Sequence, residues 1–172
     1  MTKPKFHDRL ISPKVSNLEE AIRKRAELRV TGVSMVMTNG CFDLLHAGHV
    51  FFLNEAAKLG DELWVMVNSD KSVKRLKGPH RPIWDEIQRS YNLASLECVS
   101  RVHIFHNERL DHEIVALEPD VYSKAGDYSL ETLHPEERGA LERVGATIRF
   151  LPFLEGFSTT AMIENIRSSG DL

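Results

Sequence analysis

The fold class that the sequence predicts is α/β, a doubly wound, Rossmann-like domain with a five-stranded parallel sheet. Three observations predict it. Five short apolar runs, rich in β-branched or aromatic residues, are spaced along the 172 residues. Segments with helical patterns separate them, as in βαβ units. Hydrophobic residues make up 42% of the chain and charged residues 27%, a composition typical of globular domains. Consecutive βαβ units place helices on both faces of a parallel sheet.

The five predicted strands are short and apolar, as strands buried on both faces are. In chain order they are 33–38 ("VSMVMT"), 62–68 ("ELWVMVN"), 101–106 ("RVHIFH"), 120–124 ("DVYSK") and 146–152 ("ATIRFLP").

The predicted helices begin and end at recognisable capping residues. Ser16 or Asn17 caps the first helix, Asp85 and Asp111 are predicted N-caps, and Gly60 and Gly145 are predicted to end helices. The helical patterns cover 16–29, 48–59, 85–99, 111–118, 135–144 and 158–169.

The length predicts a single domain over 1–172, with a helical lead-in at 1–32 and a catalytic core at 33–167. A net charge of −3 and a pI near 6.2 argue against a nucleic-acid partner, because binding its many phosphates would require a broad cationic surface. No apolar window reaches the length of a membrane span, so no membrane partner and a cytoplasmic location are expected. Two cysteines make neither a disulfide framework nor a complete zinc site.

Polar, glycine-bearing segments follow the predicted strands, where ligands bind in such folds. After the first strand comes 39–49 ("NGCFDLLHAGH"), and after the second Asn68, Ser69 and Asp70 lead into a basic run. The fourth leads into "KAGDY" and the fifth into "LEGFSTT". Phosphate recognition needs segments of this kind.

His46 and His49 flank the start of a helix, where free N–H groups and the helix dipole favour an anion. Three residues apart, both imidazoles can face one point, and Gly48 lets a phosphate approach the backbone. A surface pair of histidines is the alternative. Zinc is less well supported, because helical metal pairs usually lie four residues apart.

The other polar residues have structural alternatives. Ser158, Thr159 and Thr160 are an N-cap signal, and Lys77 and Arg81 are consistent with loop charges. Arg89 is placed to pair with Asp85 on a helix, and Asp127 and Tyr128 are consistent with a turn. Neither a P-loop nor a GxGxxG motif is present, and Cys41 is interpreted as a buried thiol beside the site.

Three segments resemble the cytidylyltransferase-like nucleotidyltransferases, which carry an HxGH motif. Within that family they are most similar to the adenylyltransferases that activate D-glycero-D-manno-heptose 1-phosphate. The segments are "TNGCFDLLHAGHVFFLNEAAKLGDEL", "VNSDKSVKRLKGPHRP" and "LPFLEGFSTTAMIENI", and the resemblance covers roughly 33–167.

The resemblance implies roles for individual residues. His46, His49 and Lys77 would act on the reacting phosphates. The nucleotide would contact Asn39, Gly40, Cys41, Phe42, Gly48, Arg89, Gly126, Asp127, Tyr128, Ser158, Thr159 and Thr160. The acceptor would contact Asp43, Asn68, Asp70 and Lys14.

The implied reaction is attack of a sugar phosphate on the α-phosphorus of ATP, with release of pyrophosphate. Mg²⁺ would be held through the nucleotide phosphates rather than by protein ligands. Phe153 stands where CTP-dependent relatives carry an arginine, which favours ATP. Ala125 departs from the "KGGDY" of the heptose enzymes.

The resemblance also implies a homodimer and a separate sugar kinase, since 172 residues leave no room for a fused kinase domain. Two other functions stay open. One is a CTP-dependent cytidylyltransferase acting on a polyol or alcohol phosphate such as glycerol 3-phosphate. The other is a nucleotide-binding module without catalysis.

Overall fold

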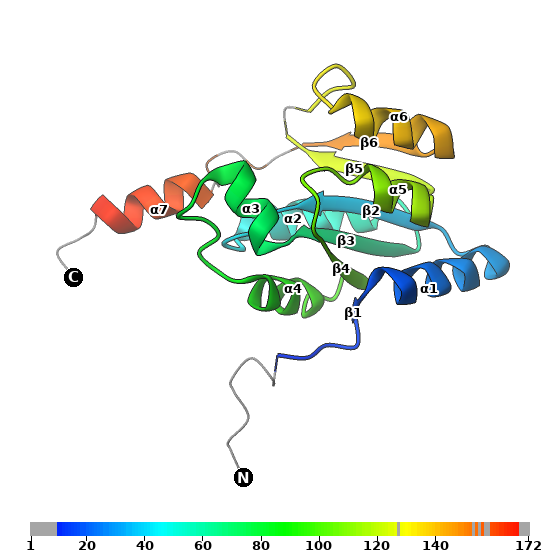
Figure 1. The fold of residues 1–172 in the computed structure, drawn as a ribbon, viewed down its shortest axis with the longest axis horizontal. Coiled ribbons are helices and arrows are strands. Elements are labelled where there is room, and N and C mark those ends of the chain that lie inside the picture. The colour runs from blue at the N-terminus through cyan, green and yellow to red at the C-terminus, as the bar shows by residue number, and fades with distance from the viewer. Residues whose placement is uncertain (1–9, 127, 153, 155, 157–158, 169–172) are drawn as a thin grey trace, which may run out of the picture.

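The structure is a computed structural model that describes residues 10–126, 128–152, 154, 156 and 159–168. Helices and strands alternate along the chain, except that two helices lie between the third and fourth strands (Figure 1). Their bounds are β1 Val15–Ser16, α1 Leu18–Thr31, β2 Met35–Gly40, α2 Ala47–Ala57, β3 Glu62–Asn68, α3 Asp70–Lys77, α4 Glu86–Ala94, β4 Arg101–Phe105, α5 Asp111–Leu117, β5 Val121–Ala125, α6 Pro135–Val144, β6 Thr147–Leu151 and α7 Thr159–Ser168.

The strands form one parallel sheet in the order β1-β4-β3-β2-β5-β6. The predicted fold class is confirmed, but the sheet has six strands rather than five among the residues that the structure describes. The strand that the sequence analysis missed is β1, in which Val15 pairs with Val102 and Ser16 with His103. Two residues carry no periodic pattern, so β1 is defined only by its pairing with the edge of β4.

Successive side chains of the inner strands enter two separate cores. Met35 and Met37 of β2 pack with residues of α1, α5 and α6, whereas Val36 packs with residues of α2 and α4. The same alternation separates Trp64 from Val65 in β3. Helices therefore cover both faces of the sheet (Figure 1), which explains why these strands are continuously apolar.

Helix α3 was not predicted as a helix, because its sequence "DKSVKRLK" is short and strongly cationic. The capping pattern was nevertheless present. The Ser69 side chain accepts a hydrogen bond from the Ser72 N–H, Asp70 lies in the first turn, and Lys74 and Lys77 lie in the last turn. Lys77 thus ends a helix instead of lying in a flexible loop.

Several predicted helix boundaries were wrong, among them the end of α4, which was predicted at residue 99 and lies at Ala94. Leu110 rather than Asp111 occupies the N-cap position of α5. Helix α2 ends at Ala57, before Gly60. Gly60 has a packing role instead, because a Cβ there would lie 2.8 Å from Cγ2 of Val36.

Helix α1 is fixed to the far end of α5 by a buried arginine. Arg25 donates from Nε to the carbonyl oxygen of Leu117 at 3.0 Å and from Nη2 to that of Glu118 at 2.8 Å. The same guanidinium pairs with the Asp120 carboxylate at 3.0 Å. These contacts join the amino-terminal helix to the central domain.

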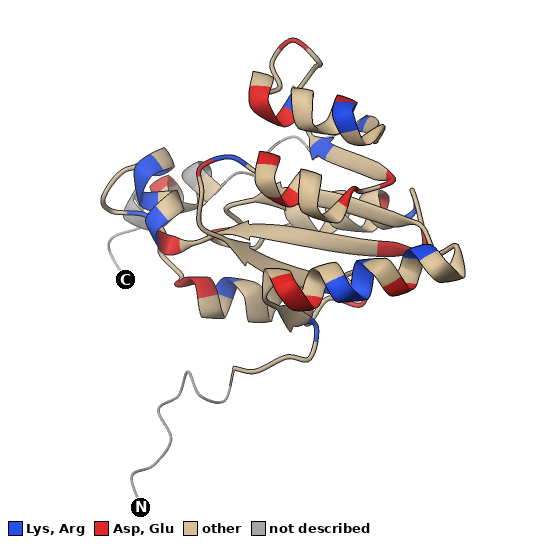
Figure 2. Ribbon diagram, turned by 45° about the vertical axis from the view of Figure 1, so that its right-hand side comes forward, with Lys and Arg blue, Asp and Glu red and all other residues tan. Residues whose placement is uncertain are grey.

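Charged residues lie mainly on the helices and loops (Figure 2). Strand β2 carries no charged residue, and Glu62 is the only one in β3. Within the described ranges, every helix is too short or too polar to cross a lipid bilayer.

Candidate active site at the switch point of the sheet

The main cleft lies where the strand order reverses. Strand β2 pairs with β3 on one side and with β5 on the other, so the chain leaves β2 in one direction and later returns on its opposite side. Residues 39–43 at the end of β2 and residues 124–125 at the end of β5 line a cleft of about 640 Å³. This is the position at which doubly wound sheets bind ligands.

The cleft brings together many of the residues that the sequence analysis selected. They come from the ends of strands, from helix starts and from α3, and are far apart in the sequence. They are Asn39, Gly40, Cys41, Phe42, Asp43, His49, Asn68, Lys77, Tyr128 and Thr159.

The two histidines form a stacked pair at the start of α2. His46 is the N-cap, and its Nδ1 accepts a hydrogen bond from the His49 N–H at 3.4 Å. The ring centroids are 3.8 Å apart, and Phe42 lies 5.3 Å from the His49 ring. Because Nδ1 of His46 is an acceptor, the neutral ring carries its proton on Nε2.

Burial keeps the histidine pair neutral in the ligand-free protein. Desolvation, followed by the neighbouring His46, lowers the pKa of His49 to about 4, and a backbone contact with Leu44 opposes this. Desolvation also lowers the pKa of His46. At neutral pH both rings therefore act as hydrogen-bond donors without a full charge, until an anion binds close enough to favour the imidazolium.

The turn after β2 has a backbone shape that few residues allow. Phe42 has a φ of 46°, and a Cβ on Gly40 would lie only 3.0 Å from Cε2 of the Phe42 ring. Glycine at position 40 lets the aromatic ring fold back over the strand end. Burial raises the pKa of the Cys41 thiol between them, which fits a neutral thiol rather than a nucleophile.

Asp43 holds this turn to the segment before α4. Its Oδ1 accepts hydrogen bonds from the N–H groups of Ile83 at 2.7 Å and Trp84 at 3.1 Å. Its Oδ2 pairs with the Arg81 guanidinium. Both carboxylate oxygens already have partners in the protein. An acceptor that contacts Asp43, as predicted, would compete with these partners for the carboxylate.

Arg89 makes a second connection between the same segments. Its guanidinium donates to the carbonyl oxygen of Cys41 at 2.6 Å, to that of Trp84 at 3.0 Å and to the Asp70 carboxylate at 2.8 Å. The residue is 1% exposed. Arg89 is not the partner of Asp85, which caps α4. In this buried position Arg89 is better placed to stabilise the turn after β2 than to contact a nucleotide directly.

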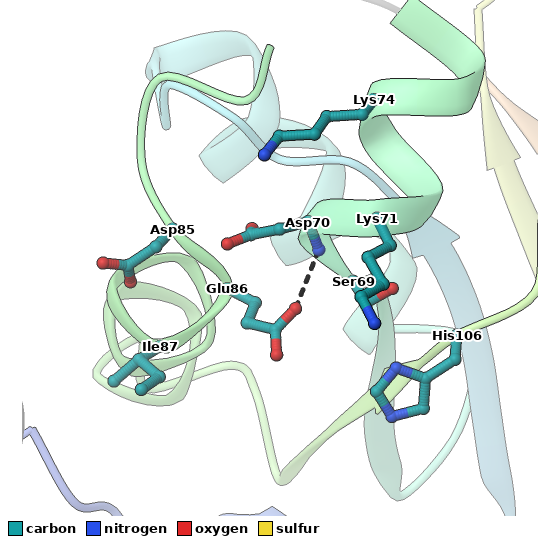
Figure 3. Close-up of a pocket in the computed structure, with 8 residues that line it drawn as sticks. All are labelled: Ser69, Asp70, Lys71, Lys74, Asp85, Glu86, Ile87 and His106. Carbon is teal, nitrogen blue, oxygen red and sulfur yellow. Dashed lines mark hydrogen bonds between the residues drawn. The ribbon is translucent and has the colours of Figure 1, made fainter. Parts of the chain in front are cut away.

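Asp70 lies in a second cavity, of about 660 Å³, between α3 and α4. Figure 3 shows its carboxylate beside Glu86, whose Oε2 accepts a hydrogen bond from the Asp70 N–H at 2.7 Å. Lys74 and His106 line the same cavity. Asn68, by contrast, lines the main cleft, where its Nδ2 donates to Ser72 Oγ at 2.9 Å.

Some predicted site residues lie away from the cleft or outside the described residues. Lys14 donates to the carbonyl oxygen of Leu96 at 3.0 Å and precedes β1, at the opposite end of the sheet, so the structure separates it from the other candidates. Gly126 turns the chain out of β5 with a φ of 80°. Outside the described residues lie Asp127, Phe153, Ser158 and the side chain of Thr160.

Several polar residues of the cleft were missed. Arg109 follows β4, Lys124 is in β5, and Thr132, His134 and Glu137 lie before or at the start of α6. Lys124 offered a signal, because it lies at the end of a predicted strand. The positions of the others depend on how α5 and α6 pack, which the local sequence pattern does not specify.

The described side chains include no group of three or more His, Cys, Asp or Glu placed to hold a metal ion. The carboxylates nearest the turn are also occupied, since Asp43 pairs with Arg81 and Asp70 with Arg89. The residues present thus fit a metal that is carried by phosphate oxygens better than one bound by a protein cage.

Comparison with known proteins identifies the family. Residues 37–169 match the family described as cytidylyltransferase-like. The chain belongs to the cytidylyltransferase-like family of nucleotidyltransferases. The resemblance carried by the three segments is therefore confirmed for the family, and the matched residues include the histidine pair and the turn after β2.

Curated relatives of this cytidylyltransferase-like chain are longer proteins. It is 42% identical over 153 residues to the bifunctional protein HldE of Trichlorobacter lovleyi, covering 89% of this chain and 31% of that protein. It is 46% identical over 141 residues to HldE of Hahella chejuensis, covering 82% of this chain and 29% of that protein. The chain spans about a third of the length of the relatives it matches.

Solved structures share the fold. The lipopolysaccharide core biosynthesis protein of Thermoplasma volcanium is 30% identical with a TM-score of 0.58, over 72% of this chain and 98% of that one. The pantoate-beta-alanine ligase of Francisella tularensis is 12% identical with a TM-score of 0.55, over 91% of this chain and 77% of that one. The second likeness shows the fold alone.

Proposed function

We propose that this protein transfers the adenylyl group of ATP to a sugar 1-phosphate, D-glycero-D-manno-heptose 1-phosphate, giving ADP-heptose and pyrophosphate. The observation that carries the proposal is the stacked pair of His46 and His49, of which His49 lines the switch-point cleft of a cytidylyltransferase-like domain. The similarity to HldE proteins supports heptose 1-phosphate as the acceptor. The similarity to a lipopolysaccharide core biosynthesis protein supports lipopolysaccharide biosynthesis as the pathway.

In the proposed reaction an oxygen of the acceptor phosphate attacks the α-phosphorus of ATP, and the bond to the β-phosphate oxygen breaks. His49 lines the cleft and donates a hydrogen bond to the phosphorus-bound oxygens as their charge grows. Lys77, at the end of α3, faces the same cleft and adds a cation for the departing pyrophosphate. One such donor typically contributes about 3 kcal/mol to transition-state stabilisation.

The remaining residues orient the substrates. Asp43 and Arg89 fix the turn that carries Cys41 and Phe42, so that its backbone is already shaped when the nucleotide arrives. Thr159 at the start of α7 lines the cleft and offers a helix start to the phosphates. Mg²⁺, when bound with ATP, would neutralise part of the phosphate charge and would be held through the phosphates.

The test is pyrophosphate release with ATP or CTP, each combined with heptose 1-phosphate or glycerol 3-phosphate. We expect turnover with ATP and heptose 1-phosphate, and a loss of about a hundredfold to a thousandfold in kcat for His46→Ala and His49→Ala. His112→Ala is the matched control, because its side chain is 64% exposed on α5. Turnover only with CTP and glycerol 3-phosphate would refute the assignment.

The alternative CTP-dependent reaction is not favoured, since the relatives are HldE proteins. A binding module without catalysis would retain ATP affinity but release no pyrophosphate in the same assay. As part of the proposal, the protein is a cytoplasmic homodimer that uses neither nucleic acid nor membrane as a partner. A separate sugar kinase supplies its substrate.

A further inference from the structure

Two buried residues outside the active site carry polar atoms that the proposed reaction does not use. Ser16 is 7% exposed and Glu113 is 5% exposed. Among the residues that the structure describes, neither Oγ of Ser16 nor Oε2 of Glu113 has a hydrogen-bond partner. Most buried polar side-chain atoms in proteins do have a partner, so this pair requires an explanation.

Both residues line one cavity of about 530 Å³ at the edge of the sheet, where β1 pairs with β4. The residues that define this edge cavity include Ser16, Leu18, Glu86, His103, Phe105 and Glu113. Among the described residues, none lines both the edge cavity and the switch-point cleft. Glu86 and His106 also line the neighbouring cavity of Figure 3. One water molecule occupies about 30 Å³ in the liquid, so the edge cavity has room for an organic ligand.

The charges around the edge cavity favour a cation. Its described lining residues include the carboxylates of Glu86 and Glu113 but no lysine or arginine. The nearest histidine does not supply the missing donor, because Nδ1 of His112 lies 3.9 Å from Oε1 of Glu113, beyond hydrogen-bond distance. Desolvation raises the pKa of Glu113, and a cation bound beside this carboxylate would favour its ionised form.

His103 adds an acceptor to the same cavity. Its Nδ1 lies 3.0 Å from the carbonyl oxygen of Ser16, which can only accept, so Nδ1 carries a proton. Desolvation lowers the pKa of His103 and thereby favours the neutral ring, in which Nε2 is an acceptor. The lining thus combines several acceptors with the apolar side chains of Leu18 and Phe105. This combination suits a ligand with a positively charged donor group and an aliphatic body.

We propose that the edge cavity binds a primary aliphatic ammonium ion, whose N–H groups donate to Ser16 and Glu113 while its carbon chain packs against apolar side chains. A primary ammonium group has three N–H donors and no acceptor, which matches these partners. The carboxylates of Glu86 and Glu113 would repel an anion. The site goes beyond the proposed function and does not depend on it.

Three ligands with the same six-carbon chain test the role of charge. They are hexylammonium, 1-hexanol and hexanoate, and isothermal titration measures the affinity of the full chain for each. Amide chemical shifts of the ¹⁵N-labelled protein locate the bound ligand. The variants are Glu113→Gln, which removes the charge at nearly constant shape, and Ser16→Ala. The control is Glu97→Gln, an exposed residue outside the edge cavity, and thermal unfolding verifies that each variant is folded.

We expect hexylammonium to bind about tenfold or more tightly than either other ligand, with shifts at Ser16, His103 and Glu113. Glu113→Gln should weaken its binding about tenfold and Ser16→Ala about threefold, whereas the control should bind normally. The site would be overturned by no binding, by equal affinities for the three ligands, by affinities that neither variant changes, or by shifts confined to the switch-point cleft. If Glu113→Gln does not fold, Ser16→Ala and the comparison of ligands on the wild type decide the question.

Discussion

Replacing Arg89 with methionine tests whether the buried guanidinium fixes the turn after β2. The substitution removes three hydrogen bonds, to Cys41, Trp84 and Asp70, in a residue that is 1% exposed. Breaking a buried ion pair typically costs 3–5 kcal/mol. The Asp70 side chain is 31% exposed and can regain water, so we expect about 3 kcal/mol. For a chain of this size that is a fall in Tm of about 6–12 °C.

Urea unfolding followed by tryptophan fluorescence measures this loss. The control is Arg138→Met, which removes an exposed pair with Glu142 on α6 and should change stability by less than about 0.5 kcal/mol. Arg89→Lys keeps the charge but cannot reach three acceptors with a planar fork, so most of the loss should remain. Equal stability of Arg89→Met and Arg138→Met would refute the reasoning.

Three further predictions concern the cleft. Because the folded pKa of His49 is about 4, below its ordinary 6.5, its neutral form contributes stability that is complete above pH 6.5 and is lost as the pH falls toward 4. Unfolding from pH 7 to pH 4 should therefore show a loss of stability that is up to about 3 kcal/mol smaller in His49→Asn than in the wild type, and an equal loss in both proteins would contradict it. Gly40→Ala should cost about 1–3 kcal/mol in the same unfolding assay, because its Cβ meets Phe42, whereas Gly139→Ala in open space on α6 should gain about 0.5–1 kcal/mol. Lys77→Ala should lower kcat in the pyrophosphate assay about a hundredfold or more at unchanged Tm, and a normal kcat would remove Lys77 from the reaction.

Local patterns predicted the parts of the site that depend on one turn of chain. The histidine pair at the start of α2 could be recognised because a capping position and a residue three positions later always share one side of a helix. The two inner strands were recognisable by their uninterrupted apolar residues. These features need no knowledge of distant contacts.

Long-range packing explains what the sequence analysis missed. Lys124 lines the same cleft as the turn after β2, because β5 pairs with β2 rather than with β4. Asp70 was predicted beside the acceptor, but Arg89, on the next helix, draws its carboxylate into another cavity. Lys14 was predicted at the site, but the structure separates it from the cleft, because β1 joins the sheet at the far edge.

The attachment of α1 has a practical consequence for expressing this domain. The family match begins at residue 37, yet Ala21 and Leu28 of α1 belong to one of the two cores. A chain cut at the family boundary would expose that apolar surface and free the outer edge of β4, an arrangement that favours aggregation. Shortened versions of the chain for crystallisation or fusion should therefore start upstream of β1.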